Sequence, residues 1–211
     1  MNAFTGSTAL WYASRATGTV SIVLLTLVML LGVGVSGRRT VPGLPKLVVL
    51  GLHRNASLLA VAFLAVHIVT AVVDPFVTIA WADALIPFHS SYQPLWLGLG
   101  AVAIDLLIAI LITTALRKHI SRGAWKVVHW SAYAVWPVAL VHGIMTGPDL
   151  RSGPLLATSV ACAALVAYAA AWRMKISRSA ARRLQSERED ATLVARPNRQ
   201  DPGEMRPALP A

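Results

Sequence analysis

The composition of this chain excludes an ordinary soluble domain. Of its 211 residues, 56% are apolar and only 13% are charged, which is typical of a protein embedded in a membrane. A net charge of +10 would suggest nucleic acid in a soluble protein, but here the nineteen Lys and Arg lie between and after long apolar runs. The basic residues therefore indicate membrane topology, and nucleic acid is not an expected partner.

Five apolar runs are long enough to cross a bilayer, which takes about 20 mostly apolar helical residues. In chain order they lie at 17–36, between Arg54 and Asp74 with a start several residues earlier near Lys46, at 94–116, between Lys126 and Asp149, and between Arg151 and Arg173. The first run has no convincing cleavage site after it and is expected to remain as a helix. Cys162, the single cysteine, is interpreted as a packing residue in the fifth run. The sequence predicts an all-α integral membrane protein, a bundle of five transmembrane helices.

Two further segments connect or follow these runs. The connection from Asp74 to Gln93 is long for a compact bundle and contains four aromatic residues, Phe76, Trp81, Phe88 and Tyr92. We expect its middle, FVTIAWADALIPF, to form a short interfacial helix that caps the outer end. The tail, 174–211, is basic and contains four prolines. It is expected to form one short helix and otherwise to be largely disordered.

The distribution of Lys and Arg predicts the orientation. One side holds four in the first connection, four in the third and nine after the fifth run, whereas Arg15 and Arg151 alone lie on the other side. By the positive-inside rule, the N-terminus is outside and the C-terminal tail is cytoplasmic, which agrees with five crossings. The expected location is the cell membrane, as a multi-pass protein of a bacterial plasma membrane.

Four histidines lie inside the expected spans and form two pairs. His53 and His67 are fourteen residues apart in the second run, and His129 and His142 are thirteen apart in the fourth. Each separation is about 20 Å along a helix at ~1.5 Å per residue. The two runs cross in the same direction, so His53 and His129 share the inner depth, and His67 and His142 share the outer depth.

Two histidines that face each other at one depth can bind the iron of a porphyrin from both sides. The pattern predicts two stacked haems, an inner one at His53 and His129 and an outer one at His67 and His142. Because both axial positions would be filled, electron transfer is favoured over oxygen binding. The chain has no CxxCH motif, so the haems would be held non-covalently and be b-type. Zinc or a di-iron site would need more acids, but Asp105 is the only acid within a span.

The spacing in the fourth run does not fit an ideal helix. Thirteen residues at 100° each leave His129 and His142 roughly 140° apart around the axis. Pro137 lies between them, and a proline lacks the N–H and crowds the preceding turn. We expect a distortion there.

Several segments together resemble the ferric reductase-like transmembrane domain family. They are WYASRATG, GLHRNASLLAVAFLAVH, the DPF turn, SYQPLWLGLG and WKVVHWSAYAVWPVALVHG. The family includes ferric reductases, the membrane half of NADPH oxidases, and the haem subunit of the periplasmic methionine sulfoxide reductase system. The resemblance covers 9–173 and implies a haem domain there, followed by the tail 174–211. It implies two haem b groups that pass electrons across the membrane. No Gly-rich nucleotide fingerprint follows Arg173, so no FAD or NAD(P)H site is expected in this chain.

Several other residues lie near the expected haem sites or in the connections. Arg15 and Arg54 could pair with the propionates of the outer and inner haem, or could anchor the chain at lipid headgroups. Asp105 could assist proton movement or bond to a neighbouring helix. Gly51 and Gly143, beside ligand histidines, could admit a porphyrin or pack helices. His89 and His119 lie in connections and are expected to be solvated or interfacial.

The leading functional hypothesis is a transmembrane electron conduit, the haem membrane subunit of an oxidoreductase. A cytoplasmic flavin reductase or a membrane quinol would be the donor, and an extracytoplasmic compound or protein the acceptor. The alternative is a haem-free membrane transporter or proton pathway that uses Asp105 and the intramembrane histidines. A purely structural subunit that has lost activity is a third possibility, which four intact histidines disfavour.

Overall fold

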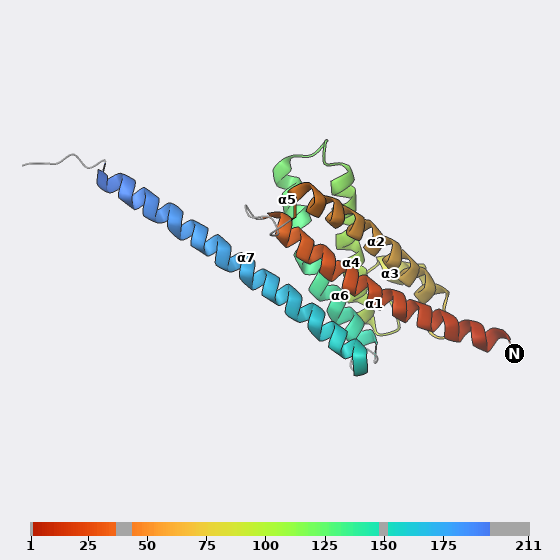
Figure 1. Ribbon diagram of the computed structural model, residues 1–211. Helices are drawn as coiled ribbons and strands as arrows, with labels where there is room; N and C mark the ends of the chain where they lie inside the picture. The colour runs from red at the N-terminus through yellow and green to blue at the C-terminus, as the bar shows by residue number, and fades with distance from the viewer. Residues whose placement is uncertain (1, 37–43, 148–151, 195–211) are drawn as a thin grey trace, which may run out of the picture. The chain divides into compact units, whose positions relative to one another are not determined.

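The computed structural model describes residues 2–36, 44–147 and 152–194, and these contain helices and no strand. The helices are α1 (Asn2–Ser36), α2 (Lys46–Val73), α3 (Trp81–Leu85), α4 (Pro94–Ala115), α5 (Arg122–Trp130), α6 (Ala132–Thr146) and α7 (Gly153–Val194) (Figure 1). Five stretches are long and apolar enough to cross a membrane: Thr8–Val35, Lys46–Val73, Pro94–Ala115, Arg122–Thr146 and Gly153–Thr192. The predicted all-α, five-span membrane fold is therefore confirmed.

The chain divides into two units, residues 1–170 and 171–211, and each is described by itself. The first unit contains α1 to α6 and the start of α7. In the second unit, α7 continues past the expected end of the span at Arg173 as far as Val194, with mostly exposed side chains. The first part of the predicted tail is thus helical, and 195–211 lie outside the described residues.

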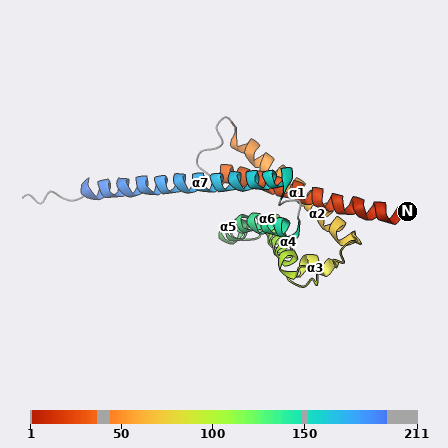
Figure 2. The same cartoon turned by 90° about the horizontal axis from the view of Figure 1, so that it is seen from below.

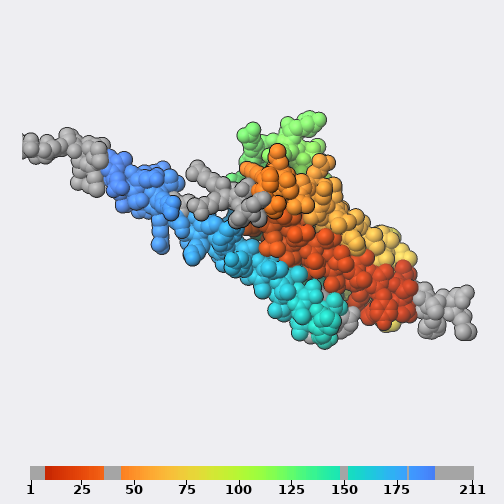
Figure 3. Space-filling view, viewed as in Figure 1, coloured from red at the N-terminus to blue at the C-terminus, as the bar shows by residue number. Residues whose placement is uncertain are grey.

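Helices α1 and α2 lie side by side along much of their lengths (Figures 1 and 3). Many of their Leu and Val side chains are exposed, as expected where lipid surrounds a helix. Hydroxyl groups along α1 donate to carbonyls one turn earlier, as in Ser21 Oγ to Thr17 O at 2.8 Å and Thr26 Oγ1 to Ile22 O at 2.8 Å. This bonding satisfies the hydroxyls within their own helix, without a water partner.

The largest apolar cluster joins α1, α6 and the start of α7. Its buried members are Ile22, Trp136, Leu140 and Cys162. The buried indole of Trp136 donates from Nε1 to Thr26 Oγ1 at 2.8 Å, so a polar bond fixes α6 against α1. Cys162 lies in this cluster, which agrees with its interpretation as a packing residue.

The fourth span is broken into α5 and α6 at Ser131. The Ser131 N–H and hydroxyl both donate to Val128 O, at 3.0 and 2.7 Å, and the Ala134 N–H donates to Ser131 O at 2.8 Å. These are three-residue closures, tighter than an α-helical turn. The expected distortion between His129 and His142 is present, but it lies at Ser131, while Pro137 lies inside α6. Tighter turns advance about 120° per residue instead of 100°, which rotates His142 back toward the face of His129.

The long connection after α2 forms the expected short helix, α3, which lies against α4 (Figure 2). Asp83 holds it together: Oδ2 accepts from the Ala80 N–H at 2.9 Å and Oδ1 accepts from His89 Nδ1 at 2.8 Å. The hydrogen bond from His89, with that from Ala80, keeps the pKa of the Asp83 carboxyl below its ordinary value of 3.8. Phe88, with a positive φ of 66°, packs directly on Gly98 of α4, where a side chain would collide with it. The connection is therefore held together by Asp83 and contacts α4 through Phe88.

Candidate functional site

The first histidine pair consists of His53 on α2 and His129 on α5. The centres of the two imidazole rings are 6.4 Å apart, and the ring planes meet at 67°. A metal ion about 2 Å from one nitrogen of each of two opposed imidazoles holds the ring centres roughly 6 Å apart. The spacing of the first pair therefore fits one metal ion bound between the rings.

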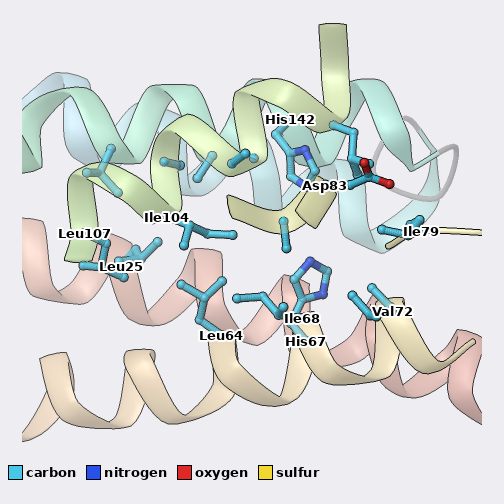
Figure 4. Close-up of a pocket in the computed structure, with 18 residues that line it drawn as sticks. Leu25, Leu64, His67, Ile68, Val72, Ile79, Asp83, Ile104, Leu107 and His142 are labelled. Carbon is cyan, nitrogen blue, oxygen red and sulfur yellow. The ribbon is translucent and has the colours of Figure 1, made fainter. Parts of the chain in front are cut away.

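The second histidine pair consists of His67 on α2 and His142 on α6. Both residues line the same two cavities, of about 90 and about 250 Å³, and their rings point toward each other in Figure 4. Apolar side chains such as Leu25, Leu64 and Ala139 make up much of both walls. Asp83 of α3 also lines the smaller cavity, so the connection between α2 and α4 covers this pair. An apolar space between two imidazoles suits a large, mostly apolar ring that carries a metal.

Three of the four histidines are oriented by a backbone carbonyl of a neighbouring helix. The Nδ1 atoms of His53, His67 and His142 lie 3.1, 2.8 and 2.8 Å from the carbonyl oxygens of Val28, Ser14 and Trp96. A carbonyl can only accept, so Nδ1 carries the proton in each ring and Nε2 keeps its lone pair. No hydrogen bond among the described residues uses these three Nε2 atoms. Histidines that bind metals are commonly oriented in this way.

His129 is held differently. Its Nδ1 is buried and has no hydrogen-bond partner within the described part of the chain. Its ring instead stacks on Trp125, one turn earlier in α5, with ring centres 4.7 Å apart and planes at 17°. The guanidinium carbon of Arg117 lies 4.4 Å from the centre of the Trp125 ring. Stacking therefore takes the place of the hydrogen bond.

Glycines face three of the four rings. A Cβ at Gly18 would lie 3.0 Å from the ring of His67, one at Gly32 3.4 Å from that of His53, and one at Gly100 2.7 Å from that of His142. The absence of a side chain lets α1 and α4 approach α2 and α6 closely enough for the carbonyl bonds to form. Sequence reasoning missed these glycines. Gly18 and Gly32 are fourteen residues apart, as are His53 and His67, and this matched spacing on consecutive spans could have identified them.

The other predicted residues lie in different surroundings. Arg15 is half-buried, lines the larger cavity beside the second pair, and lies 4.8 Å from the Trp11 ring centre. Arg54 is exposed and lines neither cavity. Asp105 is half-buried in α4 and lines neither cavity, and no hydrogen bond to its carboxylate occurs among the described residues. His89 pairs with Asp83, whereas His119 is exposed.

The two remaining glycines of the sequence analysis differ. A Cβ at Gly51 would meet no atom within 4 Å, so close helix packing does not explain this glycine. Gly143 lines the larger cavity beside His142.

Across the described ranges, no group of three or more His, Cys, Asp or Glu could hold a metal ion, so a site made of many protein ligands is not seen there. Among the described residues the four histidines lie as two pairs, an arrangement that suits a haem iron bound by two histidines.

One comparison with known proteins gives a match. Residues 17–140 match a family described as the ferric reductase like transmembrane component. The matched range includes His53, His67 and His129 and ends two residues before His142. Comparison with curated proteins finds no match, and neither does comparison with solved structures.

Proposed function

Because the chain belongs to the ferric reductase-like transmembrane family, we propose that it carries electrons across a membrane through two b-type haems, one held by each histidine pair. The observation that carries this proposal is the orientation of His53, His67 and His142. In each of them a backbone carbonyl accepts a hydrogen bond from Nδ1–H, which leaves Nε2 able to bind a metal. Each pair also supplies one ligand from α2 and one from the fourth span.

When bound, such a haem supplies a one-electron carrier whose iron has both axial positions filled by protein. The residues of this chain have three tasks around it. The histidines would hold the iron, the carbonyls of Ser14, Val28 and Trp96 would orient them, and the apolar walls would exclude water. Arg15, at the cavity of the second pair, is placed to pair with propionates there. Arg54 remains a weaker candidate for the first pair, because it is exposed.

We propose that the first pair lies toward the cytoplasm and the second toward the outside, with the N-terminus outside, in a bacterial plasma membrane. The support is the position of the basic residues: the exposed Arg117, Lys118, Arg122 and Lys126 surround the start of α5, which carries His129. In this orientation a cytoplasmic flavin reductase or a membrane quinol would donate electrons at the site held by His53 and His129, and an extracytoplasmic acceptor would receive them at the site held by His67 and His142. The haem domain would be 9–173 and the cytoplasmic tail 174–211.

The position of Asp105 argues for the conduit over the haem-free transporter. A proton pathway through Asp105 and the histidines would need them to share a polar space. Asp105 lines neither cavity that contains His67 and His142, and the walls of those cavities are mostly apolar. An apolar space favours a porphyrin over a chain of protons or hydrated ions.

Purification and reconstitution test the proposed function. Protein produced with ample haem should contain two haems per chain and give a b-type spectrum when reduced by dithionite. In liposomes, a reductant on one side should reduce both haems, and a membrane-impermeant oxidant on the other side should reoxidise them. Protein that binds no haem under these conditions would contradict the proposal.

Single substitutions then test the pairing. His67→Ala and His142→Ala should each remove the same haem and leave the other, and His53→Ala and His129→Ala should remove the complementary one. His89→Ala and His119→Ala are the matched controls, because these histidines lie outside the pairs, and both should retain two haems. Loss of the same haem in His53→Ala and His67→Ala would contradict the proposed pairs.

A further inference from the structure

The column of side chains beside the first pair is not explained by metal binding alone. Arg117 lies over Trp125, Trp125 stacks on His129, and the His129 ring faces His53. The indole is also tied to α4, because Trp125 Nε1 donates to Thr114 Oγ1 at 3.4 Å. Side chains from α4 and from the turn after it thus hold the Trp125 indole, which in turn stacks on the His129 imidazole.

This stack occurs at the one histidine of the four whose buried Nδ1 has no hydrogen-bond partner among the residues that the structure describes. A ligand imidazole must be prevented from turning about its side-chain bonds, and in the other three a carbonyl does this. A flat stack fixes the plane of a ring but leaves it free to slide, so it needs an anchor of its own. Thr114 and Arg117 provide that anchor by holding the indole on its edge and its face.

Resting on the proposed function, we infer that Trp125 is a positioning residue for the first haem, which sets the plane of its axial ligand His129. Arg117 secures the indole and places a positive charge close to this end of the site. An imidazole whose N–H bonds to an acceptor is a more basic ligand, and within the described ranges no acceptor lies at His129 Nδ1. Lower ligand basicity and a nearby positive charge both favour the reduced iron. The first haem is therefore easier to reduce than it would be with a carbonyl on His129.

The test uses full-length haem-loaded protein and two readouts other than activity: the EPR spectrum of each oxidised haem and its reduction potential. The EPR signal of a bis-histidine haem depends on the angle between its two imidazole planes. Trp125→Leu should change the signal of the first haem and leave that of the second unchanged. Trp125→Phe, which keeps an aromatic ring, should restore most of the wild-type signal. Arg117→Gln should lower the potential of the first haem only.

The matched control is a second cation–aromatic pair on the same helix. Lys126 Nζ lies 5.1 Å from the ring centre of Trp130, whose side chain is exposed, and no ring contact between Trp130 and a histidine occurs among the described residues. Trp130→Leu should therefore change neither haem. If Trp125→Leu loses the first haem outright, retention of that haem in Trp125→Phe supports the inference.

The inference is overturned if Trp125→Leu and Arg117→Gln both leave the first haem as in the wild type, or if Trp130→Leu changes it equally. It is also overturned if Trp125→Phe is as damaging as Trp125→Leu. These outcomes differ from failure of the proposed function, in which the wild-type protein itself would bind no haem. The His53→Ala and His67→Ala proteins assign each signal to its pair.

Discussion

The two histidine pairs have the same ligands but are supported by different forces. In the second pair both rings are held by carbonyls and both face a glycine, Gly18 opposite His67 and Gly100 opposite His142. In the first pair only His53 has this support, while His129 rests on a tryptophan. Hydrogen bonds fix a direction strictly, whereas stacking fixes a plane and tolerates sliding. Two sites of equal composition can therefore differ in rigidity.

The largest effect should come from adding one methyl group where the second pair is tightest. In Gly100→Ala the new Cβ would lie 2.7 Å from the His142 ring, which is tied to Trp96 O and cannot easily move away. We expect a loss of about 1–3 kcal/mol in stability from overpacking, together with reduced occupancy of the second haem. Thermal unfolding and the haem-to-protein ratio measure the two effects.

Alanine at other glycines should have a smaller effect where the contact with the histidine ring is longer. Gly18→Ala, with its contact at 3.0 Å, should do less damage to the second pair, and Gly32→Ala, at 3.4 Å, should hardly disturb the first. Gly51→Ala is the control, since its Cβ would meet nothing within 4 Å. Equal loss of haem in all four variants would show that the close approach of α1 and α4 does not support the histidines.

A smaller and selective effect is expected at Arg15. Arg15→Gln removes a positive charge beside the cavity of the second pair, which disfavours the reduced form of that haem. The equilibrium constant for reduction of the second haem should fall by up to about tenfold, which corresponds to ~59 mV in reduction potential for one electron. The first haem should be unaffected. Redox titration of both haems measures this. Arg54→Gln is the comparison, and because Arg54 is exposed its effect on the first haem should be much smaller. A larger shift for Arg54→Gln would reverse the roles assigned to the two arginines.

The smallest effect concerns the connection that covers the second pair. Hydrogen bonds from His89 and Ala80 lower the pKa of Asp83 in the folded protein. The stability that this carboxylate contributes is thus present above pH 3.8 and is lost as the pH falls below that value through the lower folded pKa. Hydrogen exchange in 76–90, relative to α4, should rise a few-fold on acidification.

Asp83→Asn should produce the same loosening at pH 6, where the wild-type loop is closed. His119→Gln, which changes an exposed histidine in another connection, should not. If Asp83→Asn leaves exchange in the loop unchanged at pH 6, the carboxylate does not hold the loop, and the second pair is covered by apolar contacts alone.

The spans and the relative depth of the histidines could be predicted because both depend on regular helical rise and apolar length. Pro137 indicated a distortion in the fourth span. The distortion lies at Ser131, however, and this position depends on which hydroxyl donates to a carbonyl of the preceding turn, here the Ser131 hydroxyl to Val128 O. The carbonyls of Ser14, Val28 and Trp96 could not be predicted, since every residue carries one. The role of Trp125 could not be predicted from the sequence either, because tryptophans are common near a membrane surface for other reasons.

The break at Ser131 has a consequence for how the two sites can change. His53 and His67 share the unbroken α2, so a shift of that helix moves a ligand of both pairs. His129 and His142 are on the separate helices α5 and α6, so no single continuous helix carries both of these ligands. Substitutions in α5 should therefore combine additively with those in α6, whereas substitutions in α2 should not. A substitution in α5 or in α6 should therefore change the histidine pair on its own helix and leave the other pair unchanged.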